Sequence, residues 1–178
     1  MSENTFIEMF SGIGGFRIGL ERAGWKCVWA NDINPHANKI YAKHFGYKEL
    51  RGGDIYDIRP EDIPNHKLLV AGFPCQSFSI AGERLGTKEH RGILFHQIAR
   101  IAEAKRPPLL LLENVRGLLS SRNGEDFAII LRVLGNLGYI LSWQCFNSKH
   151  FRGPQNRERV FIVGNLGEKC GEQIFPVF

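Results

Sequence analysis

The sequence predicts an α/β fold, a doubly wound and mostly parallel β-sheet with helices on both faces. Three observations predict it. Apolar, strand-like runs alternate with helix-like segments along the whole chain. A length of 178 residues suits a single domain. A hydrophobic content of 43% and a charged content of 23% are typical of globular proteins and exclude disordered and fibrous classes.

The N-terminal half alternates short strands with two helices. Apolar side chains dominate each strand-like run, and a glycine-rich loop leads from the first run into the first helix. Pro35 suits the first turn of the second helix, because its missing N–H group would have no partner there in any case. The expected elements are a strand at 6–10, a loop at 11–15, a helix to about 23, a strand at 26–31, a helix at 35–45 and a strand at 67–71.

The C-terminal half continues the alternation and ends in two strands. Apolar residues recur on one helix face around residues 93–102 and again at 127–137, where their spacing is i, i+3, i+4, i+7 and i+10. Between these helices, the run at 109–113, four leucines that end in Glu113, predicts a buried strand. Strands at 139–146 and 159–164 close the pattern and are expected to pair as a hairpin.

Charge and residue spacing narrow the class of protein. The net charge is +5, and residues 73–160 carry 13 Lys and Arg against 7 Asp and Glu. Such an excess suits a phosphate-binding face, although an ordinary solvated surface explains it equally well. No run reaches the roughly 18 apolar residues of a membrane helix, and no secretory signal is recognisable, so we expect a cytoplasmic protein. The cysteine and histidine spacings match neither a zinc site nor a disulfide framework.

A glycine-rich loop and two acids indicate a pocket for a small ligand. The loop F-S-G-I-G-G at 10–15 lets a ligand approach the backbone and the free N–H groups of a helix start. Arg17 stands where a dinucleotide-binding loop has its third glycine, which favours a nucleoside or amino-acid ligand over a pyrophosphate. Asp32, 20 positions after Gly12, suits a ribose, and Asp54 could meet a nucleobase edge. A tight turn with two surface acids remains the simpler alternative.

A cysteine follows the strand at 67–71, on the loop G-F-P-C-Q-S-F-S. Ligands bind at the carboxyl ends of strands in an open parallel sheet, so Cys75 would lie beside the ligand pocket, held by Pro74. A buried cysteine usually acts as a small hydrophobic residue. Exposure on a loop favours a nucleophile here.

A glutamate and two arginines complete the candidate residues. Glu113 ends the apolar strand at 109–113, where a partly desolvated carboxyl group can exchange a proton with a substrate. A glutamate that caps the following turn is the alternative. Arg157 and Arg159 flank an acid in Q-N-R-E-R, which by itself indicates only an ion-pair cluster.

Taken together and in this order, these motifs resemble those of the cytosine-C5 DNA methyltransferases. The resemblance covers about residues 5–164. It implies a Rossmann-like, S-adenosylmethionine-dependent methyltransferase fold that is incomplete at its C-terminus. The matching motifs are the loop at 10–15, Pro74-Cys75-Gln76, Glu113-Asn114-Val115 and Gln155-x-Arg157-x-Arg159.

The resemblance implies methyl transfer from S-adenosylmethionine to C5 of a cytosine in double-stranded DNA, within a restriction-modification system. The target base must be flipped out of the duplex to be reached. Cys75 would add covalently to C6, and Glu113 would contact N3 and the exocyclic amine. Arg157 and Arg159 would hold the base and the active-site carboxylate by charge-assisted hydrogen bonds.

The same match assigns contacts residue by residue. Asp32 would hold the ribose and Asp54 the adenine amino group of the cofactor. No metal ion is implied. Cofactor contacts fall to Phe10, Gly12, Gly14, Asp32, Ile33, Asp54, Ile55 and Pro74. DNA contacts fall to Gln76, Ser79 and Arg91.

Two segments are expected. Residues 1–166 would form the catalytic, cofactor-binding domain, and 167–178 would begin a linker to an absent target-recognition region. Family members continue with that region and with two motifs, one of which helps to complete the cofactor pocket. We therefore expect a second subunit, a truncated product or a piece of a longer chain. The expected location is the bacterial or archaeal cytoplasm, with nucleoid association through DNA binding.

Two other classes of function stay open at this point. One is a cysteine hydrolase that pairs Cys75 with His96 or His150, but the sequence lacks an oxyanion glycine motif. The other is a non-catalytic, partner-dependent fragment that only binds DNA. The presence of Cys75 and Glu113 disfavours a fragment that has lost its catalytic function. It is compatible with an enzyme that depends on a partner.

Overall fold

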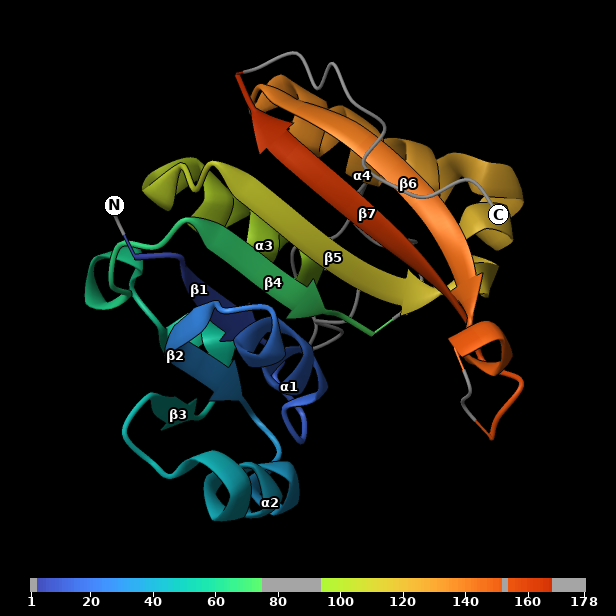
Figure 1. The fold of residues 1–178 in the computed structure, drawn as a ribbon. Helices are drawn as coiled ribbons and strands as arrows, with labels where there is room; N and C mark the ends of the chain where they lie inside the picture. The colour runs from blue at the N-terminus through green and yellow to red at the C-terminus, as the bar shows by residue number, and fades with distance from the viewer. Residues whose placement is uncertain (1–2, 75–93, 152–153, 168–178) are drawn as a thin grey trace, which may run out of the picture.

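A seven-stranded β-sheet forms the centre of the computed structural model, which describes residues 3–74, 94–151 and 154–167 (Figure 1). The strand order is β3-β2-β1-β4-β5-β7-β6. The first five strands in this order pair in parallel, and β7 pairs antiparallel with both β5 and β6. The strands are β1 (Thr5–Met9), β2 (Lys26–Asp32), β3 (Leu50–Gly52), β4 (Leu68–Gly72), β5 (Leu109–Val115), β6 (Tyr139–Asn147) and β7 (Glu158–Leu166).

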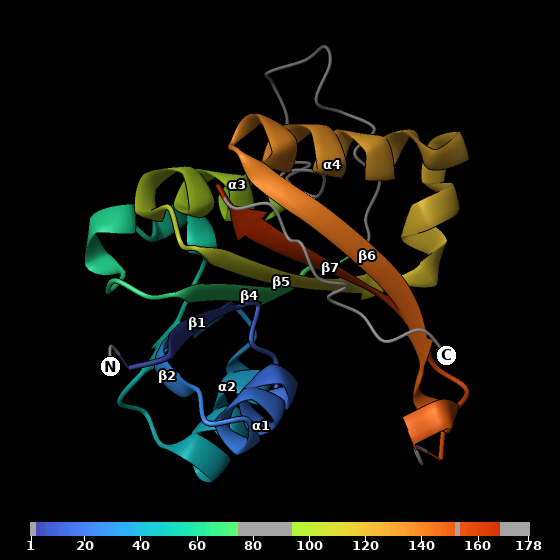
Figure 2. The ribbon, with the colours of Figure 1, turned by 45° about the horizontal axis from the view of Figure 1, so that its top comes forward.

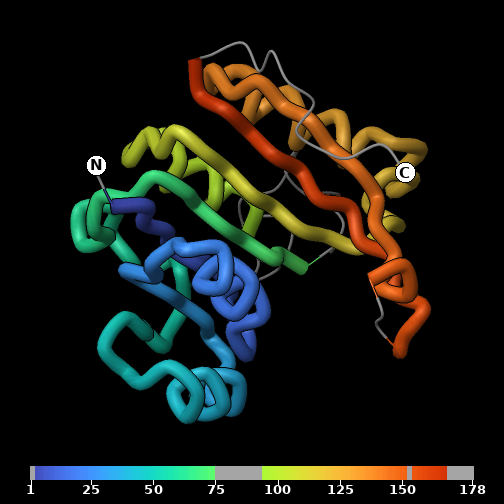
Figure 3. Tube along the Cα trace, viewed as in Figure 1, coloured from blue at the N-terminus to red at the C-terminus, as the bar shows by residue number. Residues whose placement is uncertain are grey.

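The doubly wound arrangement and the final hairpin that the sequence predicts are confirmed. The chain runs outward from β1 to β3 and then crosses back to β4 on the other side of β1, as the colours of Figure 3 show. This reversal makes the boundary between β1 and β4 the topological switch point of the sheet. Ligands of such sheets bind at the carboxyl ends of the strands at this point.

Helices cover both faces of the sheet, as predicted. Figure 2 shows α3 and α4 on one face and α1 and α2 on the other. In α2 the predicted start is confirmed, because the Asn34 side chain accepts hydrogen bonds from the N–H groups of His36 and Ala37, and Pro35 follows it. The helices are α1 (Gly15–Arg22), α2 (Pro35–Phe45), α3 (Leu94–Lys105) and α4 (Glu125–Asn136). No helix of the described segments is long and apolar enough to cross a membrane.

The structure also contains short elements that periodicity does not predict. Strand β3 has only three residues, too few for a recognisable alternation. The first strand ends one residue earlier than predicted, because Phe10 turns the chain with a φ of 55°. The described residues also form 3₁₀ helices η1 (Ile55–Asp57), η2 (Pro60–Asp62), η3 (Arg116–Gly124) and η4 (Ser148–Phe151).

The two halves of the sheet differ in how their faces are covered. Along β5, Leu110 and Leu112 are fully buried beneath α3 and α4, while Leu109 and Leu111 on the opposite face are only partly buried. In Figures 1 and 2, α1 and α2 cover this opposite face beside β1, β2 and β4. No described helix lies over the same face of β5, β7 and β6.

Candidate active site

The glycine loop between β1 and α1 lies at the switch point and has one packed and one open side. Gly12 has a φ of 54° and Gly14 a φ of 89°, conformations that favour glycine. A Cβ atom on Gly14 would collide with Phe45 of α2, whereas a Cβ on Gly12 would meet no atom within 4 Å. Ser11 is buried, and its Oγ has no hydrogen-bond partner among the described residues. The open side at Gly12 therefore leaves room for a ligand.

Asp32 ties the glycine loop to the end of β2. Its Oδ2 accepts a hydrogen bond of 2.7 Å from the Gly12 N–H, and its Oδ1 accepts one of 2.8 Å from the Asn34 N–H. An ionised carboxylate has about four acceptor positions, so about two remain for a ligand hydroxyl. Asp32 thus shapes the predicted ribose site before any ribose is bound.

The next residue in the predicted cofactor set is an exposed apolar side chain. Ile33 is 64% exposed, which leaves its apolar surface open to a flat ring.

Asp54 caps η1, where its Oδ1 accepts a 3.1 Å hydrogen bond from the Tyr56 N–H. Ile55 is only 2% exposed and packs in the core. Any contact between Ile55 and a cofactor would therefore involve its backbone.

Glu113 and Arg159 are brought together by the antiparallel pairing of β5 and β7. Arg159 lies opposite Val115, and Glu113 lies two residues earlier on the same face of β5. The Nε of Arg159 and Oε1 of Glu113 form an ion pair at 2.8 Å, and both side chains are about one-fifth exposed. The second carboxylate oxygen, Oε2, lies near Gly72, which is opposite Glu113 in the pairing of β4 with β5.

Arg157 does not take part in this pair. It is exposed and precedes β7, and its backbone carbonyl accepts a hydrogen bond of 3.0 Å from the Ser148 N–H. Within the described part of the chain its side chain forms no hydrogen bond or ion pair. Of the two predicted arginines, only Arg159 contacts the carboxylate in this structure.

Asn114 connects the ends of β4 and β5, a role that sequence reasoning missed. Its side chain is buried, and its Nδ2 donates a 2.9 Å hydrogen bond to the carbonyl of Phe73. Its Oδ1 accepts a 2.8 Å hydrogen bond from the Val115 N–H. Asn114 therefore holds the backbone just before Pro74, which is exposed at the end of the described segment. A side-chain amide close behind the apolar run of Leu109–Leu112 was the available signal.

Comparison with known proteins identifies the family. The model of the C-5 cytosine-specific DNA methylases matches residues 4–176. This chain belongs to that family.

Relatives within the C-5 cytosine-specific DNA methylases are similar over most of this chain. The type II methyltransferase M.DsaV of Dactylococcopsis salina is 46% identical over 159 residues, which are 89% of this chain and 45% of the relative. M.HaeII of Haemophilus aegyptius is 46% identical over 166 residues, which are 93% of this chain and 52% of the relative. The chain thus spans about half the length of the curated relatives it matches.

Solved structures support the fold of this methylase-family chain. The crystal structure of the Dnmt2 methyltransferase of S. pombe superposes with a TM-score of 0.79 at 30% sequence identity. The match covers 97% of this chain and 54% of the Dnmt2 chain. The predicted Rossmann-like methyltransferase fold is therefore confirmed.

Four of the residues assigned from the methylase motifs cannot be placed. Cys75, Gln76, Ser79 and Arg91 lie outside the described residues. Their roles remain predictions from the sequence. In the segments that the structure does describe, no group of three or more His, Cys, Asp or Glu side chains could hold a metal ion.

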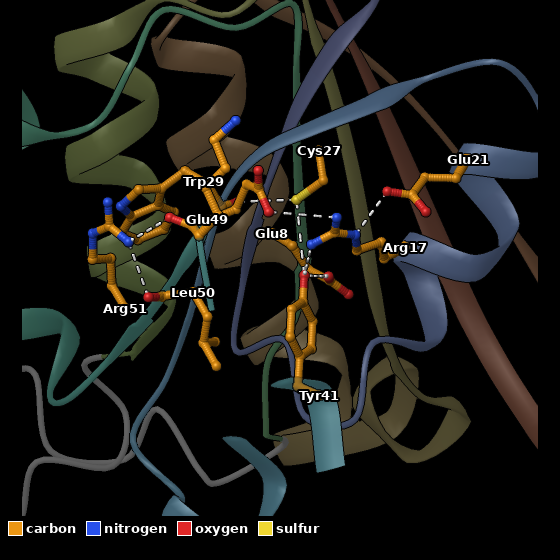
Figure 4. A network of polar contacts seen from close by, with 10 residues as sticks. Glu8, Arg17, Glu21, Cys27, Trp29, Tyr41, Glu49, Leu50 and Arg51 are labelled. Atoms are coloured by element: carbon orange, nitrogen blue, oxygen red, sulfur yellow. Dashed lines mark hydrogen bonds and ion pairs between the residues drawn. The ribbon is translucent and has the colours of Figure 1, made fainter. Parts of the chain in front are cut away.

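A buried polar network lies beneath the glycine loop of this methylase domain (Figure 4). Glu8 of β1 is 1% exposed, and its Oε2 accepts a 3.2 Å hydrogen bond from the Tyr41 hydroxyl. Burial raises the pKa of Glu8 to about 7, while the Tyr41 hydrogen bond and the nearby Arg17 charge oppose this rise. Sequence reasoning missed Glu8, although a single acid within the apolar run F-I-E-M-F was a usable signal.

Arg17 of α1 links this network to both helices on its face of the sheet. Its Nη1 donates a 3.3 Å hydrogen bond to the Tyr41 hydroxyl, and its guanidinium lies 4.6 Å from the centre of the Phe45 ring. It also forms ion pairs with Glu21 at 2.7 Å and Glu49 at 3.6 Å. Tyr41 and Phe45 of α2 also pack against Gly14, so the network supports the packed side of the glycine loop.

Proposed function

We propose that this chain is the catalytic part of a DNA (cytosine-5-)-methyltransferase of a restriction-modification system. The observation that carries the proposal is the Glu113–Arg159 pair, which lies on strands next to the Phe73–Pro74 backbone that Asn114 holds. A carboxylate fixed by an arginine suits recognition of a cytosine edge. The names of the similar type II methyltransferases support the same reaction and setting.

The residues at the switch point fit S-adenosylmethionine. Asp32 keeps acceptor positions for ribose hydroxyls, Ile33 offers apolar surface to the adenine ring, and Asp54 has Oδ2 available for its amino group. The buried Ser11 hydroxyl, which has no hydrogen-bond partner among the described residues, and the open side of Gly12 fit the polar remainder of the ligand. When bound, this cofactor supplies an electrophilic methyl group on a sulfonium ion. Phe10, Gly14, Ile55 and Pro74 complete the proposed contacts.

The proposed chemistry overcomes the weak nucleophilicity of cytosine C5. The Cys75 thiolate adds to C6, and the electron pair of the C5–C6 bond then becomes available at C5 for methylation. Glu113 stabilises the ring protonated at N3, and Arg159 keeps its carboxylate in place. Removal of the C5 proton then re-forms the double bond and expels the thiolate. Arg157 is proposed to contact the base when DNA is bound.

The substrate is proposed to be double-stranded DNA with the target cytosine flipped out. Gln76, Ser79 and Arg91 would contact the DNA, and the positive excess of residues 73–160 would attract its phosphates. Phosphate attraction fixes no sequence, so site recognition requires other surfaces. The reaction would take place in the cytoplasm of a bacterium or archaeon, in association with the nucleoid.

We further propose that activity requires a polypeptide segment outside the described residues. Val163 of β7 is only partly buried and Ile140 of β6 is 41% exposed, on the face of these two strands that no described helix covers. Contiguous apolar surface of this kind usually marks a contact site. A second subunit that carries the target-recognition region and closing motifs would cover this face. Without it, the chain would act only as a weak, non-specific DNA-binding fragment.

Methyl transfer tests this proposal directly. The chain is assayed with labelled S-adenosylmethionine and DNA, alone and with a complementing polypeptide made of the target-recognition region and closing motifs of a relative. We expect 5-methylcytosine only from the mixture, and weak, salt-sensitive DNA binding from the chain alone. Sequence-specific methylation by the chain alone would refute the need for a partner. No 5-methylcytosine from either preparation would count against the proposed function.

A further inference from the structure

Arg100 of α3 holds the turn that carries Asp54, although the two residues are far apart in the sequence. Its Nη2 donates hydrogen bonds to the backbone carbonyls of Ile55, at 3.1 Å, and Ile58, at 2.9 Å. Its Nε donates a 2.7 Å hydrogen bond to Oε1 of Gln97, one turn earlier on the same helix. Both carbonyls belong to the segment that contains η1, so one guanidinium fixes this segment onto α3.

Two further contacts fix the same turn. The Ile55 side chain belongs to the hydrophobic core, and the partly buried Tyr56 packs against the same core. Asp54 immediately precedes these residues, and its Oδ1 is already engaged by the Tyr56 N–H. Because Oδ1 has a fixed partner, the orientation of Oδ2 follows from the position of the turn.

We infer that Arg100 is a positioning residue for cofactor recognition, which acts by holding Asp54 in place to accept a hydrogen bond from the adenine amino group. The inference rests on the proposed function, in which Asp54 makes this contact. A planar guanidinium can reach two carbonyls at once, whereas a lysine ammonium on a flexible stem is less suited to do so. A turn that is ordered before the ligand arrives avoids the cost of ordering it on binding.

The test compares two ligands that differ only at the adenine edge. S-adenosylhomocysteine carries a 6-amino group, and S-inosylhomocysteine carries a 6-oxo group that cannot donate to a carboxylate through that position. Their affinities for the full 178-residue chain are measured by calorimetry at high protein concentration. We expect the wild-type chain to prefer the amino ligand by roughly tenfold or more, because the carboxylate loses its partner.

Arg100→Met should remove most of this preference by weakening the binding of S-adenosylhomocysteine more than that of the inosine counterpart. Arg100→Lys, which keeps the charge, should reduce the preference in the same way. It replaces Arg100→Met in the experiment if Arg100→Met does not fold. Equal weakening of both ligands in the folded variant would show a merely structural role and overturn the inference. An unchanged preference in either folded variant would overturn it as well.

Two controls separate this inference from the proposed function. Arg59→Met removes the same charge next to Ile58, but Arg59 is exposed and pairs only with Asp62, at 2.9 Å, among the described residues. It should keep the wild-type preference. Asp54→Asn should abolish the preference. If Asp54→Asn has no effect, the assignment of Asp54 is wrong. If Asp54→Asn abolishes the preference and Arg100→Met preserves it, only the role of Arg100 is wrong.

Discussion

Glu113→Gln is expected to lower the rate of methyl transfer by roughly 100-fold or more, measured with the complementing polypeptide present. Glutamine keeps the shape of the side chain but cannot carry the negative charge that stabilises a cytosine protonated at N3. It also loses the ion pair that Glu113 forms with the Nε of Arg159 at 2.8 Å. Both losses affect the step in which the thiolate adds to the ring, so we expect kcat to fall more than cofactor affinity.

Glu158→Gln is the matched control for this experiment. Glu158 is adjacent to Arg159 in β7, but its carboxylate pairs with Arg116 on the surface, at 2.8 Å. Exposed ion pairs contribute little to stability, so this variant should retain near-normal activity. If Glu113→Gln also retained near-normal activity, Glu113 would not be the group that activates the base.

Glu8→Gln is expected to remove a pH-dependent loss of about 3.5 kcal/mol in the free energy of unfolding. Burial raises the pKa of Glu8 from 4.5 to about 7. Between these values the folded chain holds a proton on Glu8 that the unfolded chain has released. The free energy of unfolding should therefore fall as the pH rises through this window. Each pKa unit corresponds to about 1.4 kcal/mol, which gives the expected total.

The measurement is urea denaturation of the wild type and Glu8→Gln at a series of pH values between about 4 and 8. The variant cannot release this proton, so its stability relative to the wild type should increase as the pH rises from about 4.5 to about 7 and stay constant above that. Glu21→Gln also removes a carboxylate that pairs with Arg17, but at the partly exposed rim of the network, and it should not reproduce this trend. A wild-type minus Glu8→Gln difference that is flat with pH would contradict the account.

The strands and long helices could be predicted because their signals are local. Apolar runs and helical spacing indicated β1, β2, β4, β5, β6, β7 and all four helices in the described residues to within a few positions. The turn at Phe10 could not be predicted, since a φ of 55° is unusual for a bulky residue and leaves no local pattern. Strand β3 lies at the sheet edge and is too short to show a period.

The site could be predicted only in so far as its residues form motifs. A contact of Arg157 and Arg159 with the active-site carboxylate was expected from the resemblance alone, and in this structure only Arg159 pairs with Glu113, through the antiparallel pairing of β5 and β7. The contacts of Asn114 and Arg100 go to backbone carbonyls, which any residue type provides. Such contacts impose no preference for a residue type at the position that provides the carbonyl, so a single sequence cannot indicate them.

The central claim is that Cys75 attacks cytosine, and covalent trapping on DNA with 5-fluorocytosine tests it most directly. Fluorine replaces the hydrogen that must leave C5 in the last step, so the thiolate cannot be expelled and the adduct persists. With S-adenosylmethionine and the complementing polypeptide, we predict a chain–DNA adduct that survives denaturing electrophoresis and is absent from Cys75→Ser. An adduct that still forms in Cys75→Ser, or methylation of normal DNA without any adduct on the fluorinated DNA, would contradict the account.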